Sequence, residues 1–192
     1  MIVVKWTPIQ ETKWIPPFGQ ELEDHIYAYQ NLRVRYASCS AWGLLYRILT
    51  EQGLGSGIVS FQKYGKPVFR DSDLFFSISH SRKICGAAIS DHPVGVDVEL
   101  CRDHYKQSMI ERSLSERERA SFDGDFTRIW CRKESLAKMT GTGLMGYPNT
   151  IDTCRPGIEF YEEKVVFGED RYWLISAMAL DDTYNKTEKK KK

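Results

Sequence analysis

The chain has few cysteines for its length, and their spacing forms no recognisable framework. Its 192 residues include five cysteines, an odd number, and no two of them have Cys-x-x-Cys spacing. Cys101 and His104 form a single Cys-x-x-His pair, and no second pair follows at the spacing of metal ligands. The sequence therefore argues against a disulfide framework and against a structural zinc site.

Long apolar segments are also lacking. The longest apolar run, WLISAMAL, has eight residues and is too short to cross a bilayer. The opening residues, MIVVKWTPIQ, have neither the apolar core nor the small-residue cleavage site of a signal peptide. We therefore expect a cytoplasmic protein with no membrane partner.

A strong net charge is absent as well, since the formal value is +1 at neutral pH. The last seven residues, KTEKKKK, contain five lysines and one glutamate, so a tail of +4 follows a body of −3. An acidic body does not indicate a nucleic-acid partner. The lysine run is typical of a disordered end, with an electrostatic docking tag as the alternative.

Helical and strand patterns alternate in a way that predicts an α+β fold. We expect a strand at about 2–6, a helical stretch at about 20–50 in two pieces, and short strands up to residue 100. A second helix over 125–139 and a closing hairpin follow. Because helix-then-strands occurs twice, we predict two similar α/β halves in a pseudo-twofold arrangement, with the active site in the cleft between them. The expected divisions are an N-terminal half (1–101), a C-terminal half (102–182) and a disordered lysine-rich tail (183–192).

Two carboxylates stand on one face of the expected strand VGVDVEL. Asp97 and Glu99 alternate with valines and a leucine, so their Cβ atoms lie about 7 Å apart by the strand rise. Like charges at that distance repel each other and raise each other's pKa unless a cation lies between them. The pair either faces water or forms half of a metal site.

A third carboxylate, Glu134, lies in the helix WCRKESLAK. It is followed four residues later by Lys138, and the simplest interpretation is a helical ion pair worth a few tenths of a kcal/mol. The alternative places Glu134 beside Asp97 and Glu99. Three carboxylates with waters and a phosphate suit magnesium, and neighbouring lysines would then bind that phosphate.

Smaller polar groups lie in two short segments. SISHS places Ser79 and His80 at a strand end among small hydroxyl residues, where a structural histidine is the ordinary expectation. The absence of a Gly-x-Ser-x-Gly elbow makes a serine hydrolase a weak interpretation. YGKP places Lys66 in a tight turn, as either a solvated lysine or an anion ligand.

Together, four segments resemble the 4′-phosphopantetheinyl transferases: YGKPVF, FSISHS, GVDVE and WCRKESLAKMTGTGL, in this order and at these distances. The match is to the larger, two-half branch whose type is the surfactin synthetase-activating enzyme. In the small trimeric branch the Asp-bearing strand opens the chain, whereas here it lies mid-chain. The matching segments cover roughly residues 58 to 145.

The resemblance implies a transferase with holo-acyl-carrier-protein synthase activity. Such an enzyme moves the phosphopantetheine arm of coenzyme A onto a serine of an apo acyl or peptidyl carrier protein and releases 3′,5′-ADP. It implies magnesium, with manganese as a possible substitute, bound by Asp97, Glu99 and Glu134. A chain containing both halves is expected to complete its site as a monomer.

The resemblance also implies which side chains contact the coenzyme and drive the reaction. The residues expected at the coenzyme's phosphates are Lys66, Ser79, His80, Lys133 and Lys138. Glu134 and Lys138 are the catalytic candidates, with Glu134 accepting the proton of the attacking serine. The basic residues that could hold the nucleotide end are Arg33, Arg35 and Arg47. Those that could meet an acidic carrier are Arg102, Arg112, Arg117 and Arg119.

Two other functions use the same residues. A magnesium-dependent phosphohydrolase would need the three carboxylates and the lysines but would not require YGKP or SISHS. A non-catalytic binding module could keep the fold without the reaction. The products distinguish the phosphohydrolase from the transferase, since only the transferase needs a carrier to form 3′,5′-ADP. Loss of metal binding would indicate the binding module.

Overall fold

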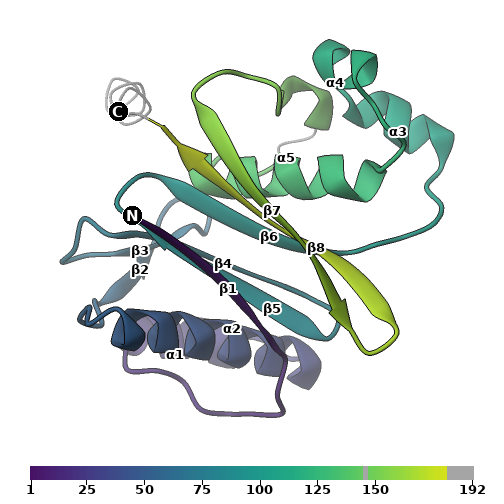
Figure 1. The fold of residues 1–192 in the computed structure, drawn as a ribbon. Helices are drawn as coiled ribbons and strands as arrows, with labels where there is room; N and C mark the ends of the chain where they lie inside the picture. The colour runs from purple at the N-terminus through teal and green to yellow at the C-terminus, as the bar shows by residue number, and fades with distance from the viewer. Residues whose placement is uncertain (145–146, 181–192) are drawn as a thin grey trace.

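Two three-stranded antiparallel sheets lie face to face, and a layer of helices covers the outside of each (Figure 1). The computed structural model describes residues 1–144 and 147–180. The mixed α and β composition confirms the coarse fold class. The predicted lysine-rich tail lies outside the described residues.

The first sheet has the order β1-β5-β4, and α2 packs on its outer face. The helical stretch predicted at 20–50 is indeed in two pieces, and Asn31 caps the second by accepting a hydrogen bond from Arg33 N. The elements of this part are β1 (Ile2–Pro8), α1 (Gln20–Tyr27), α2 (Leu32–Glu51), β2 (Val59–Phe61), β3 (Pro67–Phe69), β4 (Phe75–Ser81) and β5 (Ile84–Ser90). β2 and β3 form a separate two-stranded sheet.

The second sheet has the order β6-β8-β7, and α5 packs on β6 and β8. Its elements are β6 (Val94–Leu100), α3 (Gln107–Ser113), α4 (Glu116–Ala120), α5 (Phe126–Thr140), a 3₁₀ turn (Pro148–Thr150), β7 (Ile158–Phe167) and β8 (Asp170–Ala179). β6 therefore pairs with strands of the second half, although the sequence boundary at 101 placed it in the first.

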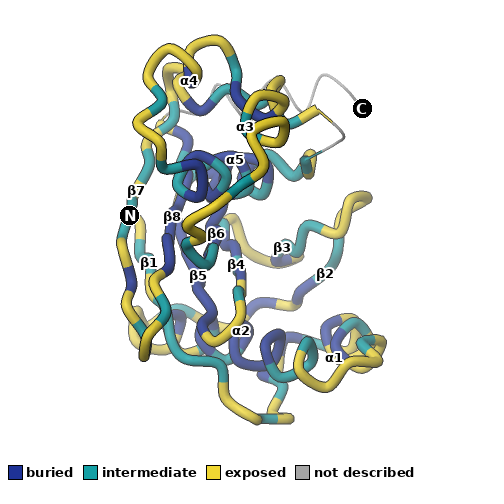
Figure 2. The backbone as a smooth tube through the Cα atoms, turned by 90° about the vertical axis from the view of Figure 1, so that its right-hand side faces the viewer, coloured by how far each residue is buried: buried dark blue, intermediate teal, exposed yellow. Residues whose placement is uncertain are grey.

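Strand β5 lies in the middle of the molecule and is buried along its whole length (Figure 2). Cys85, Ala87 and Ile89 pack towards α2, whereas Ile84 and Ala88 pack against the second sheet. Both faces of β5 are therefore covered, which explains why its sequence is a nearly unbroken run of small and apolar residues.

The two faces of β6 meet different neighbours. Val94, Val96 and Val98 belong to the apolar cluster between the two sheets. The opposite face carries Gly95 and Asp97 and lies against α5. Asp97 therefore does not face water, because a helix covers it, whereas Glu99 is half-buried.

Helix α5 begins and ends close to where the sequence predicted. The side chain of Asp125 caps its first turn by accepting a hydrogen bond from Arg128 N. At the other end Gly141 takes the left-handed conformation, with φ 72°, that terminates many helices. The helix is thus fixed at both ends over the acidic strand.

Candidate functional site

Asp97 is the buried centre of the candidate site. Its residue is only 4% exposed, and it lies on β6 between the end of β4 and helix α5. Lys138 Nζ donates to Asp97 Oδ1 at 2.6 Å, and Ser79 Oγ donates to the same oxygen at 2.9 Å. Side chains from two other elements, β4 and α5, therefore converge on one carboxylate oxygen of β6.

The pairing of Lys138 differs from the simplest sequence interpretation. Its ammonium forms an ion pair with Asp97 across the interface between α5 and β6, and it also donates to Ser79 Oγ at 2.8 Å. Lys138 still affects Glu134 electrostatically, because its charge partly offsets the rise in the pKa of that carboxyl that burial and Asp97 cause. A helix-surface pair alone would not account for these contacts.

Glu99 and Glu134 interact electrostatically with Asp97 and lie in a poorly solvated environment. Burial, followed by the charges of Asp97 and Glu134, raises the pKa of Glu99 to about 7. Burial and the charge of Asp97 also raise the pKa of Glu134. The structure thus brings the three predicted carboxylates into one electrostatic group that accumulates negative charge.

The donor chemistry of this group fits a hard cation. Asp97 Oδ2 is buried and has no hydrogen-bond partner within the described part of the chain. In the arrangement described for residues 1–144 and 147–180, no three acidic, histidine or cysteine side chains are already clustered as a metal cage. Oxygen donors with partly open coordination suit magnesium, which keeps waters and phosphate oxygens among its ligands.

Two hollows of about 260 Å³ each open beside Lys138. Both are lined by Lys138, Gly65, Pro67 and Ile78, so the YGKP turn forms part of each wall. One hollow also contains Glu134, and the other contains Ser79 and His80. Three of the four segments that the resemblance singled out therefore border one region of the surface, whereas GVDVE lines neither hollow.

Lys66 and His80 lie at the rim of this region. Lys66 Nζ donates to the carbonyl of Met139 at 2.6 Å, near the C-terminal end of α5, where a cation is favoured by the helix dipole. Burial by surrounding protein, followed by the charge of Lys138, lowers the pKa of His80. A neutral imidazole at the end of β4 is therefore favoured.

Lys133 does not join the other predicted coenzyme residues. Its side chain is 0% exposed and forms an ion pair of 2.6 Å with Glu118 of α4, which is also 0% exposed. Lys133 Nζ donates to the carbonyls of Pro148 and Ile151 as well. All three ammonium hydrogens are therefore used inside the protein.

Sequence reasoning missed Glu118, although a signal was present. Ser115 caps α4, and Glu118 stands three residues later, the spacing of a capping box. Glu118 accepts a hydrogen bond from Ser115 N at 2.8 Å and from Thr153 at both N and Oγ1. It thus joins α4, α5 and the segment after the 3₁₀ turn.

We predict that Lys133→Met lowers the free energy of unfolding by about 3–5 kcal/mol, because it leaves the Glu118 carboxylate buried without its cation. Urea unfolding measures this. Lys164→Met is a matched control, since Lys164 is exposed and lies over the Trp173 ring at 4.7 Å, where its removal should cost less than about 1 kcal/mol. Unchanged stability with weakened coenzyme A binding would instead support the coenzyme role.

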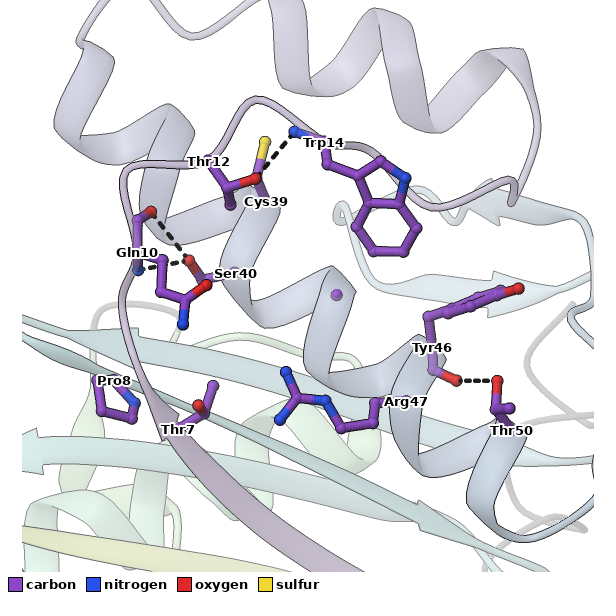
Figure 3. Close-up of a pocket in the computed structure, with 11 residues that line it drawn as sticks. Thr7, Pro8, Gln10, Thr12, Trp14, Cys39, Ser40, Tyr46, Arg47 and Thr50 are labelled. Carbon is purple, nitrogen blue, oxygen red and sulfur yellow. Dashed lines mark hydrogen bonds between the residues drawn. The ribbon is translucent and has the colours of Figure 1, made fainter.

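The arginines of the first half lie outside this region. Arg35 donates to the carbonyls of Tyr27 and Tyr29, which ties α2 to the end of α1. Arg47 projects into a separate hollow of about 320 Å³ between α2 and the loop after β1, beside Thr7 and Tyr46 (Figure 3). Neither arginine lines the two hollows at Lys138.

Comparisons with known proteins agree with this picture. A sequence model of the 4′-phosphopantetheinyl transferase superfamily matches residues 93–184. The chain is 30% identical over 139 residues to 4′-phosphopantetheinyl transferase gsp of Aneurinibacillus migulanus, covering 66% of this chain and 57% of that protein. It is 34% identical over 94 residues to 4′-phosphopantetheinyl transferase Sfp of Bacillus subtilis (strain 168), covering 44% of this chain and 42% of that protein. The chain thus spans 57% of the length of one relative and 42% of the other.

No helix in the described ranges combines the length and the apolar character needed to cross a membrane.

Proposed function

Because the chain belongs to the 4′-phosphopantetheinyl transferase superfamily, we propose that it transfers the 4′-phosphopantetheine group of coenzyme A to a serine of an apo carrier protein. The carrier would be an acyl or peptidyl carrier protein, and 3′,5′-ADP would be released. The observation that carries this proposal is that Ser79 and Lys138, which line the hollows, both contact the buried Asp97.

The metal in this proposal is magnesium, with manganese as a substitute. Asp97, Glu99 and Glu134 would hold it, because burial and the charge of Asp97 raise the pKa of both glutamates and Asp97 Oδ2 has no hydrogen-bond partner among the described residues. A bound magnesium ion would supply positive charge at the coenzyme's pyrophosphate.

The chain's own residues account for the proton and the developing charge. The carrier's serine hydroxyl forms a new bond to phosphorus while the pyrophosphate bond breaks, and the electron pair leaves with 3′,5′-ADP. Glu134 would take the hydroxyl proton, directly or through a bound water, because it is a carboxylate beside the reacting phosphate. Lys138 would stabilise the negative charge on the phosphoryl oxygens.

The coenzyme's phosphates would lie along the two hollows, next to Lys66 and His80. Lys133 is left out of this set because its ammonium is enclosed against Glu118.

The two-half organisation is part of the proposal. Each three-stranded antiparallel sheet carries a long helix on its outer face, α2 in one case and α5 in the other, which supports a pseudo-twofold relation. The divisions would be 1–101, 102–182 and a tail of 183–192, with β6 exchanged into the second sheet. A monomer acting in the cytoplasm, without nucleic-acid or membrane partners, completes the proposal.

The test is incubation with coenzyme A, magnesium and either an apo acyl or an apo peptidyl carrier protein. We expect the carrier's mass to rise by one phosphopantetheine group, 3′,5′-ADP to appear in equal amount, and both to be lost with a chelator. Phosphate released from the coenzyme without a carrier would indicate a phosphohydrolase. Coenzyme binding with no turnover on either carrier would indicate a binding module.

A further inference from the structure

The two sheets are joined at one edge by a row of serine hydroxyls on β4. Alternate residues of β4 point to the same side of the strand, and each of their hydroxyl oxygens accepts a hydrogen bond from a backbone N–H of β6. The pairs are Val96 N to Ser77 Oγ at 2.9 Å, Val98 N to Ser79 Oγ at 3.3 Å and Leu100 N to Ser81 Oγ at 3.3 Å. We call these three residues the serine seam.

Ser79 differs from the other two members of the serine seam. Its hydroxyl also donates to Asp97 Oδ1 at 2.9 Å and accepts from Lys138 Nζ at 2.8 Å. A serine hydroxyl has one hydrogen and two lone pairs. Val98 N and Lys138 use the lone pairs and Asp97 uses the hydrogen. The hydroxyl therefore has no free hydrogen with which to bind a phosphate.

The two carboxylate oxygens of Asp97 differ in their hydrogen bonds. Oδ1 receives hydrogen bonds from Ser79 and Lys138, which fixes the orientation of the carboxylate. Oδ2 is buried and has no hydrogen-bond partner among the described residues. A buried carboxylate oxygen without a donor costs free energy, which a cation at that oxygen would recover.

We propose that Ser79 is a positioning residue for the metal site. Its hydroxyl holds Asp97 by Oδ1, so that Oδ2 remains available to the cation. This inference rests on the proposed function, because it takes Asp97 as a metal ligand. It differs from the role implied by the family resemblance, in which Ser79 contacts the coenzyme's phosphates.

The experiment measures Mn²⁺ affinity by electron paramagnetic resonance of the free ion, with neither coenzyme A nor carrier present. Ser79→Ala should weaken Mn²⁺ binding about tenfold or more, the usual effect of removing a residue that orients a metal ligand. Ser79→Thr keeps the hydroxyl and should restore most of the affinity.

Ser77→Ala and Ser81→Ala are matched controls. Each removes the same kind of bond from the serine seam, but neither hydroxyl has a hydrogen bond to Asp97 among those found in the described residues. Both should bind Mn²⁺ like the unchanged chain, although all three alanine variants lose thermal stability to a similar extent.

The outcomes separate the inference from the proposed function. If the unchanged chain and Ser79→Ala bind Mn²⁺ equally, and only coenzyme A affinity falls, Ser79 is a phosphate contact and the inference is wrong. If Ser77→Ala weakens Mn²⁺ binding as much, the effect is structural and the inference also fails. A chain that modifies its carrier yet binds no Mn²⁺ in the absence of coenzyme A would overturn the inference while leaving the transferase intact.

Discussion

Replacing Gly95 with alanine is expected to remove most of the folded protein and, with it, the proposed transferase activity. A Cβ atom at this position would lie 2.9 Å from Met139 Cα and closer still to Met139 N and Ser135 O. All three are backbone atoms of α5, so no rotamer change can relieve the overlap. Overpacking against flexible side chains already costs about 1–3 kcal/mol, and we expect this substitution to exceed that range.

The helix could also respond by moving away from β6. In that case Lys138 and Glu134 would leave Asp97, and a displacement of about 1 Å can lower a rate by 10²-fold. Urea unfolding and the carrier assay together distinguish loss of folded protein from displacement of the helix.

Gly43→Ala provides a control at another glycine packed against a neighbouring side chain. Gly43 lies within α2, and a Cβ there would be 3.5 Å from the Trp14 ring, an ordinary contact. Alanine is a better helix former than glycine, so this variant should be more stable by about 0.5–1 kcal/mol. A Gly95→Ala variant as stable and active as the Gly43→Ala variant would show that β6 and α5 are not in close backbone contact.

Much of the local structure could be predicted because it depends on neighbouring residues in the sequence. The alternation in VGVDVEL, the two-piece helix before residue 52 and the closing hairpin were all found at nearly the predicted bounds. These features depend on periodicity and capping, which a single segment displays without its partners.

The features that the sequence could not show depend on contacts between distant segments. The i,i+4 spacing of Glu134 and Lys138 could not show that the ammonium turns towards Asp97. The resemblance implied that Lys133 contacts the coenzyme's phosphates, whereas in the structure its ammonium is enclosed against Glu118 of another helix. The serine seam was recognised as polar, but its role in joining two sheets required the position of β6.

Replacing Glu134 with glutamine is expected to stop carrier modification while making the metal-free protein more stable near pH 8. Glutamine has the shape of glutamate but cannot act as a base at neutral pH, and general-base catalysis contributes about 10²–10⁴-fold. We therefore expect kcat to fall by a factor in that range. Mass spectrometry of the carrier over time measures it.

The stability gain follows from the pKa of Glu134, which burial and Asp97 raise above the ordinary value of 4.5. Between the unfolded and the folded pKa the folded state binds more protons, so the stability of the metal-free chain falls as pH rises through that window. Above this pH range the charged carboxylate of Glu134 lowers the free energy of unfolding, whereas a glutamine at the same position carries no charge. The two proteins should unfold alike below about pH 4.5 and diverge above it.

Glu159→Gln is the matched control, because Glu159 is an exposed glutamate on β7 and lies outside the hollows at Lys138. It should change neither kcat nor the dependence of stability on pH. If Glu134→Gln modifies the carrier at the normal rate, Glu134 is neither the base nor an essential metal ligand. If it is inactive but less stable at pH 8, Glu134 is held by favourable contacts. Loss of activity together with a gain in stability would show that the fold keeps this carboxylate at a cost in stability because the reaction requires it.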